Sequence, residues 1–449
     1  MSATTNPTDL LAWQEERTRL MRRGVLIGYL IAIVTYCGGI TLSSFNSPDY
    51  HSWFVLGVWT PTIITTPLLL AWRLGWAKLM VPAHALPISL YLGCALQLYG
   101  LADKETAMVV ILSNIPSFIV TSMVLFWPGR DALIGLACAV IFNTVVILGF
   151  TTPPYASSYN MFYLVLPIGL ASIFLSEYRY NTTKKFFFIT RDLNKKNQNI
   201  TDSIRYAKRI QRAILPPASK IQEHLPESVI FYQPKDIVSG DFYWYHQAKD
   251  ATYLAVVDCT GHGVPGAFMS LIGFNGLNML VEEKQLDDPA EILTGLDRYV
   301  GSMLQQNQVD QSLRDGMDMI LCRIDSAKRE VQFSGAHLPL WVVRKGKLEE
   351  HKGARFPIGD QQIKNKTFST STISLEHGDT VYLSSDGFAD QFGGPENKKY
   401  YKKRFKAYLE KLAATDIAQQ ESAIQHEFNS WLGDGPQMDD VTVAGFRLV

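Results

Sequence analysis

Four aspartates stand at the ends of β-rich stretches of the sequence: Asp241, Asp258, Asp386 and Asp439. One such carboxylate would say little, because an aspartate at the end of a strand more often caps the next helix than binds a ligand. Four of them can converge on one pole of a β-rich domain, where their repulsion is relieved only if cations lie between them. Ligation by oxygen alone suits Mg²⁺ or Mn²⁺ better than Zn²⁺.

The turn that follows Asp258 is the centre of this pattern. Residues 253–257 predict a strand, and a Gly-rich turn then leads through His262 and Gly266 into a predicted helix. Cys259 and His262 have the residue types of a nucleophile and its base. A small buried cysteine within a metal-binding turn explains Cys259 better, and the sequence has no CxxC spacing that would indicate zinc or a redox pair.

These aspartates must be positioned by the C-terminal half of the chain, which predicts an α+β fold. Alternating or continuous apolar residues predict strands at 228–232, 242–246, 253–257, 319–324, 330–334, 340–344, 380–384 and 442–448. Helical patterns cover 266–283, 290–306, 399–414 and 416–432. Consecutive strands joined by Gly/Asp turns, with helices in pairs, favour a layered arrangement.

Six motifs in this half carry a resemblance to a known family. They are Ser-Gly-Asp241-Phe-Tyr, Asp258-Cys-Thr-Gly-His-Gly-Val-Pro-Gly, Ser-Gly-Ala-His337-Leu-Pro-Leu, Phe-Pro-Ile-Gly359, Ser-Ser-Asp386-Gly-Phe-Ala-Asp390 and Asp439-Asp-Val-Thr-Val. In this order they resemble the SpoIIE/RsbU-type branch of the PPM (PP2C-like) serine/threonine phosphatases, over about residues 221–449. The resemblance implies two packed β-sheets flanked by helices, with a two-metal centre at one end.

The resemblance also implies a role for each aspartate. Asp258 is expected to bridge two divalent cations, Mn²⁺ or Mg²⁺, and to be catalytic together with Asp386. The backbone carbonyl of Cys259 and the carboxylate of Asp241 would serve one ion, and Asp386 with Asp439 the other. A water activated by both cations would attack phosphorus in line, without a phosphoenzyme.

The sequence departs from the eukaryotic relatives at the first two motifs. Their acidic residue before the first aspartate is Gly240 here, so one ion has fewer protein ligands. The longer second motif shifts His262, which is either a general acid for the leaving serine or a structural residue of the turn. Lys235 is the nearest cation that could replace their phosphate-binding arginine. Asp440 is expected to support Asp439 or cap a turn, and is a weaker metal candidate.

The N-terminal half predicts a membrane domain, because charged residues almost vanish between Gly24 and Ser176. Six apolar runs approach or reach the length of about 20 residues that crosses a bilayer as a helix. They are residues 24–42, 53–72, 79–99, 107–127, 132–150 and 155–176. No Asp, Glu, Lys or Arg lies in the middle of a run, which disfavours an ion-coupled transporter.

The loops between these runs predict the orientation. Lys104 alone falls on one side, whereas the other side carries the remaining cations of the short loops, among them Arg22, Arg73, Arg130 and Lys184. By the positive-inside rule the protein is expected to be an integral, multi-pass protein of the inner (cytoplasmic) membrane, with its N-terminus and phosphatase domain in the cytoplasm.

A polar helix is predicted between the two halves, from Arg179 to Leu215, ending at Pro216-Pro217. Apolar residues recur every seven positions along it, at Leu193, Ile200, Ala207 and Ile214. This seam favours either a parallel coiled coil in a homodimer or packing of one helix on its own phosphatase domain. Its C-terminal part also resembles the segment that relays regulation in the family.

The sequence therefore predicts an N-terminal cytoplasmic segment (1–23), a six-span membrane domain (24–176), a helical linker (177–217) and a PPM/SpoIIE-like phosphatase domain (218–449). The expected function is dephosphorylation of a phosphoserine or phosphothreonine on a regulatory partner, which the resemblance suggests is a STAS-like (anti-anti-sigma) protein. No nucleic-acid partner is expected. The alternative is a membrane receptor whose phosphatase-like domain binds a partner without turnover.

Overall fold

The computed structural model describes residues 7–44, 52–75, 158–305, 315–360 and 366–448, with the single residues 78, 133, 137, 141 and 363. The chain forms two compact units, Met1–Lys196 and Asn197–Val449.

The described part of the first unit is helical. It contains α1 (Pro7–Ser44), α2 (Ser52–Arg73) and the N-terminal part of α6 (Ser158–Ile214). Trp13 of α1 is only 4% exposed because it packs against α6, with ring centroids 5.8 Å from Tyr180 and 5.4 Å from Phe187. Asp9 and Arg191 add an ion pair of 2.9 Å between the same helices.

The predicted spans fall on this unit. Residues 24–42 lie within α1, 53–72 within α2, and most of 155–176 within α6. The runs 79–99 and 107–127, and all but three residues of 132–150, lie outside the described residues. Within the described ranges, Gly263–Glu283 alone is long and apolar enough to cross a membrane by composition. That segment belongs to the second unit, where Met269, Leu277, Leu280 and Val281 pack in a core.

The linker helix was predicted with its correct C-terminal end. α6 ends at Ile214, just before Pro216 and Pro217, which cannot continue a helix. Its N-terminal part is continuous with the sixth predicted span, so span and linker form one helix.

The second unit is built on two five-stranded antiparallel sheets. The first has the order β1-β12-β9-β6-β7 and the second β2-β3-β4-β5-β8. The strands of the first sheet are β1 (Ser228–Gln233), β12 (Val441–Phe446), β9 (Thr380–Ser384), β6 (Leu340–Arg344) and β7 (Lys347–His351). Those of the second are β2 (Phe242–Gln247), β3 (Thr252–Cys259), β4 (Met317–Asp325), β5 (Glu330–Ala336) and β8 (Ser371–Ser374).

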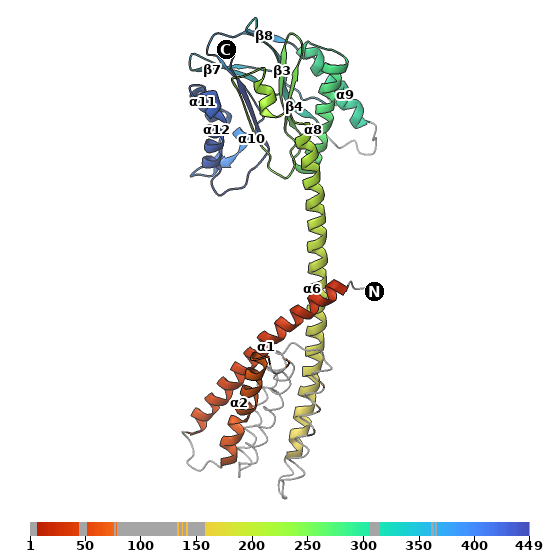
Figure 1. Cartoon of the computed structure of the whole chain (residues 1–449), viewed down its shortest axis with the longest axis vertical. Coiled ribbons are helices and arrows are strands. Elements are labelled where there is room, and N and C mark those ends of the chain that lie inside the picture. The colour runs from red at the N-terminus through yellow and green to blue at the C-terminus, as the bar shows by residue number, and fades with distance from the viewer. Residues whose placement is uncertain are drawn as a thin grey trace. The chain divides into compact units, whose positions relative to one another are not determined.

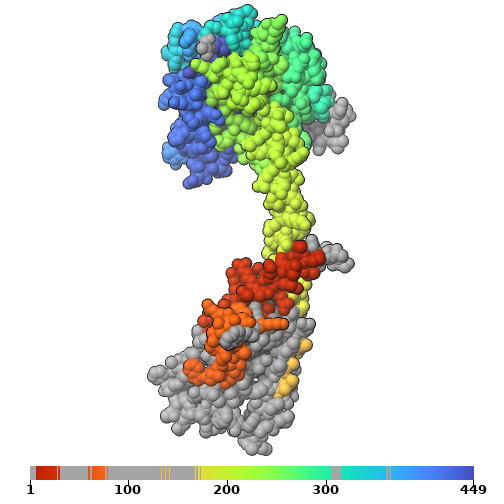
Figure 2. All heavy atoms as spheres, in the orientation of Figure 1, coloured from red at the N-terminus to blue at the C-terminus, as the bar shows by residue number. Residues whose placement is uncertain are grey.

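Helices cover the outer face of each sheet (Figure 1). The second sheet carries α8 (Gly263–Asn278), the π-helix η2 (Met279–Glu283) and α9 (Pro289–Gln305). The first carries α11 (Lys402–Leu412) and α12 (Ile417–Leu432). Figure 2 shows α11 and α12, in blue, on the side of this unit opposite α9, in green. Short elements complete it: α7 (Ala218–Gln222), α10 (Gly387–Asp390) and the pair β10 (Phe392–Gly393) and β11 (Lys398–Lys399).

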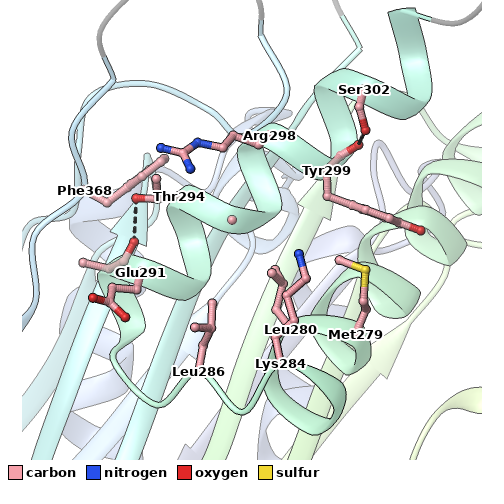
Figure 3. Close-up of a pocket in the computed structure, with 12 residues that line it drawn as sticks. Met279, Leu280, Lys284, Leu286, Glu291, Thr294, Arg298, Tyr299, Ser302 and Phe368 are labelled. Atoms are coloured by element: carbon pink, nitrogen blue, oxygen red, sulfur yellow. Dashed lines mark hydrogen bonds between the residues drawn. The ribbon is translucent and has the colours of Figure 1, made fainter.

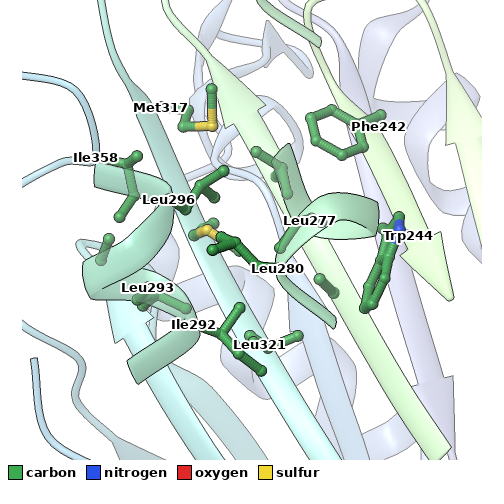
Figure 4. Packing of buried hydrophobic residues seen from close by; sticks show 14 of the residues in the cluster. Phe242, Trp244, Leu277, Leu280, Ile292, Leu293, Leu296, Met317, Leu321 and Ile358 are labelled. Carbon is green, nitrogen blue, oxygen red and sulfur yellow. The ribbon is translucent and has the colours of Figure 1, made fainter. Parts of the chain in front are cut away.

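Three cores hold these layers together. Between the sheets, Leu254 and Val256 of β3 meet Leu383 and Phe446 of the first sheet. The alternate residues of β3, such as Val257, face the opposite way toward α8 and α9, where Leu277 and Leu296 pack (Figure 4). The third core lies between the first sheet and α11 and α12. Strands buried on both faces explain the nearly continuous apolar runs in the sequence.

This arrangement confirms the predicted α+β class, two packed sheets flanked by helices. Every predicted strand is present in the structure. The edge strands β7 and β8 and the short pair β10 and β11 were not predicted.

Candidate functional site

The second sheet brings three aspartates to one of its ends. Phe242 of β2 pairs with Val257 of β3, so Asp241 and Asp258 are adjacent in the antiparallel register. On its other side, Asp258 pairs directly with Asp318 of β4. These positions follow from strand pairing alone.

The first sheet brings its own aspartates to the same place. Asp386 follows β9, while Asp439 and Asp440 precede β12, and β9 and β12 are paired. Two contacts join the sheets here. The hydroxyl of Thr442 donates to Asp241 Oδ2 at 2.9 Å, and the backbone N–H of Asp386 points to Asp258 Oδ2 at 3.5 Å, the latter a long contact.

The carboxylates of this cluster raise one another's pKa. Burial raises the pKa of Asp241 to about 8, and the charge of Asp440 acts in the same direction. Burial, followed by the charges of Asp241 and Asp386, raises the pKa of Asp258 well above its usual value. The pKa of Asp386 is raised by burial and then by the charges of Asp390 and Asp439. A site that disfavours its own negative charge in this way attracts cations.

The donor set fits hard divalent cations, since every candidate ligand is a carboxylate or carbonyl oxygen. Asp241 is 2% exposed, whereas Asp439 is exposed to solvent. In the described part of the chain, no group of three or more His, Cys, Asp or Glu side chains is arranged to hold a metal ion. The aspartates thus share one electrostatic environment without forming a closed coordination shell.

Asp440 has a structural role in the loop before Asp241. Its two carboxylate oxygens accept hydrogen bonds from the backbone N–H groups of Lys235, at 2.7 Å, and Gly240, at 2.8 Å. Burial raises the pKa of Asp440 above its usual value, and these two hydrogen bonds act in the opposite direction. The loop residue Lys235 contributes its backbone here, and the structure records no contact of its ammonium group with the cluster.

Gly240 and Gly266 allow two turns to approach closely. A Cβ atom at Gly240 would lie 2.5 Å from the carbonyl oxygen of Gly261 and 3.2 Å from that of Cys259. One at Gly266 would lie 2.3 Å from the same Gly261 oxygen. The carbonyl oxygen of Cys259 therefore lies close to the loop that carries Asp241. A side chain at position 240 would not fit without a shift of one of these turns.

His262 stands at the beginning of α8 and pairs with a residue from another loop. Its Nδ1 lies 2.6 Å from Asp236 Oδ2, and both side chains are about half exposed, at 47% and 46%. An imidazole held at Nδ1 by a carboxylate has its Nε2 available for a second partner. Cys259, in contrast, is buried in the core and burial raises its thiol pKa well above the usual value, which disfavours a nucleophilic role.

Several polar residues around the cluster were not predicted from the sequence. His337 Nδ1 lies 2.9 Å from Asp318 Oδ1, within hydrogen-bond distance. Burial raises the pKa of Asp318 and of Asp386, and the positive charge of Lys402 acts in the opposite direction. Asp236 orients His262. The sequence did contain a signal for Asp318, which is a single acid within the apolar strand segment Met317-Asp-Met319. An aspartate is seldom buried in a strand unless it has a partner.

A separate pocket of about 790 Å³ lies between η2 and α9 (Figure 3). Lys284, Glu291, Arg298 and Tyr299 line it together with apolar residues such as Phe368. None of the clustered aspartates contributes to this pocket, so the acidic site and the pocket are distinct.

Comparison with known proteins was consistent across sequence and structure. The family model described as Stage II sporulation protein E (SpoIIE) matches residues 248–449. The phosphoserine phosphatase RsbU of Bacillus subtilis (strain 168) is 29% identical over 199 residues, which cover 43% of this chain. The chain spans 55% of the length of that relative. The SiaA-PP2C domain of Pseudomonas aeruginosa is 36% identical with a TM-score of 0.52, covering 57% of this chain and 99% of that domain.

Proposed function

Since this chain belongs, through its C-terminal half, to the SpoIIE family of PP2C-like phosphatases, we propose that it is a metal-dependent protein serine/threonine phosphatase. The observation that carries the proposal is the convergence of Asp241, Asp258 and Asp386 from two sheets, at a site where burial and mutual repulsion raise their pKa values. Such perturbed carboxylates mark functional sites.

The residues of the site would have three tasks: cation binding, proton transfer and attraction of the phosphoryl group. Asp241, Asp258 and the carbonyl of Cys259 would hold one Mn²⁺ or Mg²⁺ ion, and Asp258, Asp386 and Asp439 a second. When bound, such ions lower the pKa of an attacking water and offset charge on the phosphoryl oxygens.

The remaining tasks concern proton transfer and substrate charge. His262, whose Nδ1 is held by Asp236, would protonate the oxygen of the leaving serine. The positive charge of Lys402 opposes the effect of burial on the pKa values of Asp318 and Asp386. It is a better candidate for attracting a phosphoryl group than Lys235, whose recorded contact with the cluster is through its backbone.

The substrate we propose is a phosphoserine or phosphothreonine on a STAS-like regulatory protein. The support is the resemblance of the six motifs to the SpoIIE/RsbU-type branch and the similarity to a relative named as a phosphoserine phosphatase. An acidic, open site on a rigid double sheet suits a protein substrate that presents its phosphate on a surface loop.

We further propose that residues 24–176 form a six-span domain of the cytoplasmic membrane, with the phosphatase domain in the cytoplasm, and that this domain regulates the enzyme through α6. The helices α1, α2 and α6 over three of the apolar runs support this topology, as does the bias of Lys and Arg in the loops. Reporter fusions placed after Arg73 and after Lys104 test it, because the first should report the cytoplasm and the second the opposite side.

The deciding experiment is Mn²⁺-dependent phosphate release by the full-length protein, on p-nitrophenyl phosphate and on a serine-phosphorylated STAS protein. Asp258→Asn and Asp386→Asn should each abolish turnover, while Asp250→Asn, at an exposed position between β2 and β3, should leave it unchanged. Absence of metal-dependent turnover in a folded wild-type protein would reject the enzyme and favour a non-catalytic partner-binding domain.

A further inference from the structure

Tyr401 joins β11 to α11 and has a backbone conformation that is unusual for a large residue. Its φ is 66° and its ψ is 143°, in a region that glycine enters freely and a tyrosine enters only under strain. Packing does not offset this strain, because the Tyr401 side chain is 57% exposed, whereas that of Tyr400 is buried. The ring of Tyr401 is therefore kept at this position without contributing to a core.

The first turn of α11 carries positive charge where a helix disfavours it. Lys402, Lys403 and Arg404 follow Tyr401 at the end of the helix where the macrodipole is positive, and the Tyr401 side chain does not cap this end. Arg404 is accommodated by stacking over Trp431, 4.1 Å from the ring centroid. Lys402 and Lys403 are exposed, and neither has an ion pair within the described residues.

Apolar side chains are exposed in the same region. Phe392 of β10 pairs with Lys399 of β11 and is 39% exposed. Met438, directly before Asp439, is 43% exposed. Its backbone N–H donates at 2.9 Å to Oε1 of Gln391, a buried residue of the hairpin. The β10–β11 hairpin and the loop that carries Asp439 are thus joined.

These exposed residues form what we call the hairpin surface: Phe392, Tyr401, Lys402, Lys403 and Met438. Two contacts connect it to the acidic site. Asp390 pairs with Lys399 over 3.0 Å, and the backbone N–H of Asp390 donates to the carbonyl of Asp386 at 2.9 Å. A protein that presents a phosphoserine to the acidic site therefore brings the residues beside the phosphoserine to the hairpin surface.

We propose that the hairpin surface docks the phosphorylated substrate and selects an acidic and apolar segment beside its phosphoserine. This rests on the proposed function of the acidic site as a phosphatase centre. Lys402 and Lys403 complement carboxylates of the partner, and the exposed rings and Met438 complement its apolar side chains. An anionic membrane would also attract the lysines, but the neighbouring aspartates would repel it. Docking accounts for the strain at Tyr401, since residues that oppose stability occur at functional sites.

Two synthetic phosphoserine peptides test this selection. One, the acidic peptide, carries Glu and Leu on both sides of the phosphoserine, and the other, the neutral peptide, carries Gly and Ser. We would measure kcat and KM of the full-length protein on both peptides and on p-nitrophenyl phosphate, at saturating Mn²⁺. Tyr401→Gly removes the ring and relieves the backbone strain, and Lys403→Glu reverses one charge.

Each variant has a matched control. Gln285→Gly places a glycine at another exposed residue with positive φ, 54°, in the turn between η2 and α9. Lys411→Glu makes the same charge reversal at an exposed position in the last turn of α11. Both controls should keep the wild-type kinetic constants on all three substrates.

We expect the kcat/KM of wild type to be about tenfold higher on the acidic peptide than on the neutral one, mainly through KM, the size of effect that an aromatic contact at an interface provides. Tyr401→Gly and Lys403→Glu should each lose most of this preference and keep the wild-type rates on the neutral peptide and on p-nitrophenyl phosphate. Tyr401→Gly should keep or raise the melting temperature, because the relieved strain offsets the greater freedom of glycine in the unfolded chain. A lower melting temperature with an equal loss on all three substrates would overturn the proposal.

The outcomes separate docking from catalysis. If wild type hydrolyses both peptides equally well, docking is overturned and the enzyme stands; protection of residues 392–403 from hydrogen exchange by phosphatidylglycerol vesicles would then assign the surface to a membrane. If wild type hydrolyses none of the substrates, the enzyme is rejected, and fluorescence anisotropy with the acidic peptide decides on docking. Binding that Tyr401→Gly weakens about tenfold supports docking, and absence of binding overturns it.

Discussion

The imidazole of His262 and the carboxylate of Asp236 lie 2.6 Å apart, although 26 residues separate them in the sequence. Both side chains are about half exposed, so the pair is accessible from solvent. The sequence left His262 open as a general acid or a structural turn residue. Its position at the start of α8 fits a structural role in the turn. Its contact with Asp236 fixes the orientation of the imidazole, which a general acid requires.

Leaving-group chemistry distinguishes these two roles. A serine alkoxide needs a proton as it leaves and p-nitrophenolate does not, so His262→Gln should slow hydrolysis of a phosphoserine protein by about 10²-fold and that of p-nitrophenyl phosphate far less. Asp236→Asn should reproduce the pattern more weakly. Steady-state rates on both substrates provide the measurement. An equal loss on both would show that His262 supports the turn alone.

Asp439 and Asp440 are adjacent in sequence, but Asp439 is exposed and Asp440 is buried. Replacing Asp440 should therefore affect stability, and replacing Asp439 should affect activity. Asp440→Asn places an amide N–H against one of the backbone N–H groups of Lys235 and Gly240, and should lower the free energy of unfolding by about 1–3 kcal/mol. Asp439→Asn should leave stability within about 0.5 kcal/mol while reducing Mn²⁺-dependent activity, because Asp439 is exposed. Denaturant unfolding and activity assays on both variants measure this. A stable Asp440→Asn protein would refute the structural role.

Gly240 cannot be replaced by the acidic residue of the eukaryotic relatives. Its Cβ would lie 2.5 Å from the carbonyl oxygen of Gly261, so the two turns would have to separate. We expect Gly240→Asp to lower the free energy of unfolding by about 1–3 kcal/mol and to weaken cation binding instead of adding a ligand. Gly435→Ala is the control, because its Cβ would meet only one atom, at 3.2 Å. Tighter Mn²⁺ binding by Gly240→Asp would contradict the steric argument.

The raised pKa of Asp241 predicts how stability depends on pH when no divalent cation is present. Burial raises this pKa to about 8, above the usual value of 3.8, so the folded state binds more protons than the unfolded state between these values. Its contribution to stability is therefore present at acidic pH and is lost as the pH rises toward 8.

Replacing Asp241 by asparagine removes this titration. In EDTA, Asp241→Asn should be more stable than wild type by at least about 1 kcal/mol at pH 8, and the difference should shrink toward pH 5. Added Mn²⁺ should raise the melting temperature of wild type but not of the variant. Thermal unfolding across this pH range checks both statements. A variant less stable than wild type at pH 8 in EDTA would show that the buried charge is already compensated.

The elements of this fold that could be predicted from the sequence are those whose apolar side chains are buried in a core. β3 and β4 have continuous apolar runs because a core lies on each face. β7, with the sequence Lys-Leu-Glu-Glu-His, and β8 lie at sheet edges with mostly exposed side chains, so their composition carries no strand signal. They are strands because β6 and β5 offer them backbone partners, which only the folded arrangement reveals.

The same division applies to the site. Asp241, Asp258 and Asp386 could be found because each follows or precedes an apolar strand within a recognisable motif. Asp318 is marked in the sequence only as a single acid within an apolar strand, and its place in the site depends on its register opposite Asp258. The contact of Gln211 with Ser239 depends on the approach of α6 and has no local signature. Residues that act through a partner distant in sequence are the ones that pattern analysis misses.

The apolar seam of α6 makes a final prediction about assembly. Leu193 and Ile200 are 54% and 58% exposed on this helix, seven residues apart, with Ile204 half-buried in the same seam. Large aliphatic side chains that recur in this spacing and face solvent are typical of a coiled coil that lacks its partner. We therefore predict that the full-length protein is a homodimer joined along α6. Burial of each isoleucine contributes about 1.5–3 kcal/mol.

Ile200→Asp combined with Ile204→Asp should convert the dimer to a monomer and change the phosphatase activity, because Gln211 of the same helix contacts Ser239, two residues before Asp241. The matched control is Asn199→Asp with Ser203→Asp, which adds the same charge with the same spacing at exposed positions on the same helix. Light scattering after gel filtration gives the oligomeric state of each variant. A double variant that keeps the mass and the activity of wild type would mean that the seam is no dimer interface.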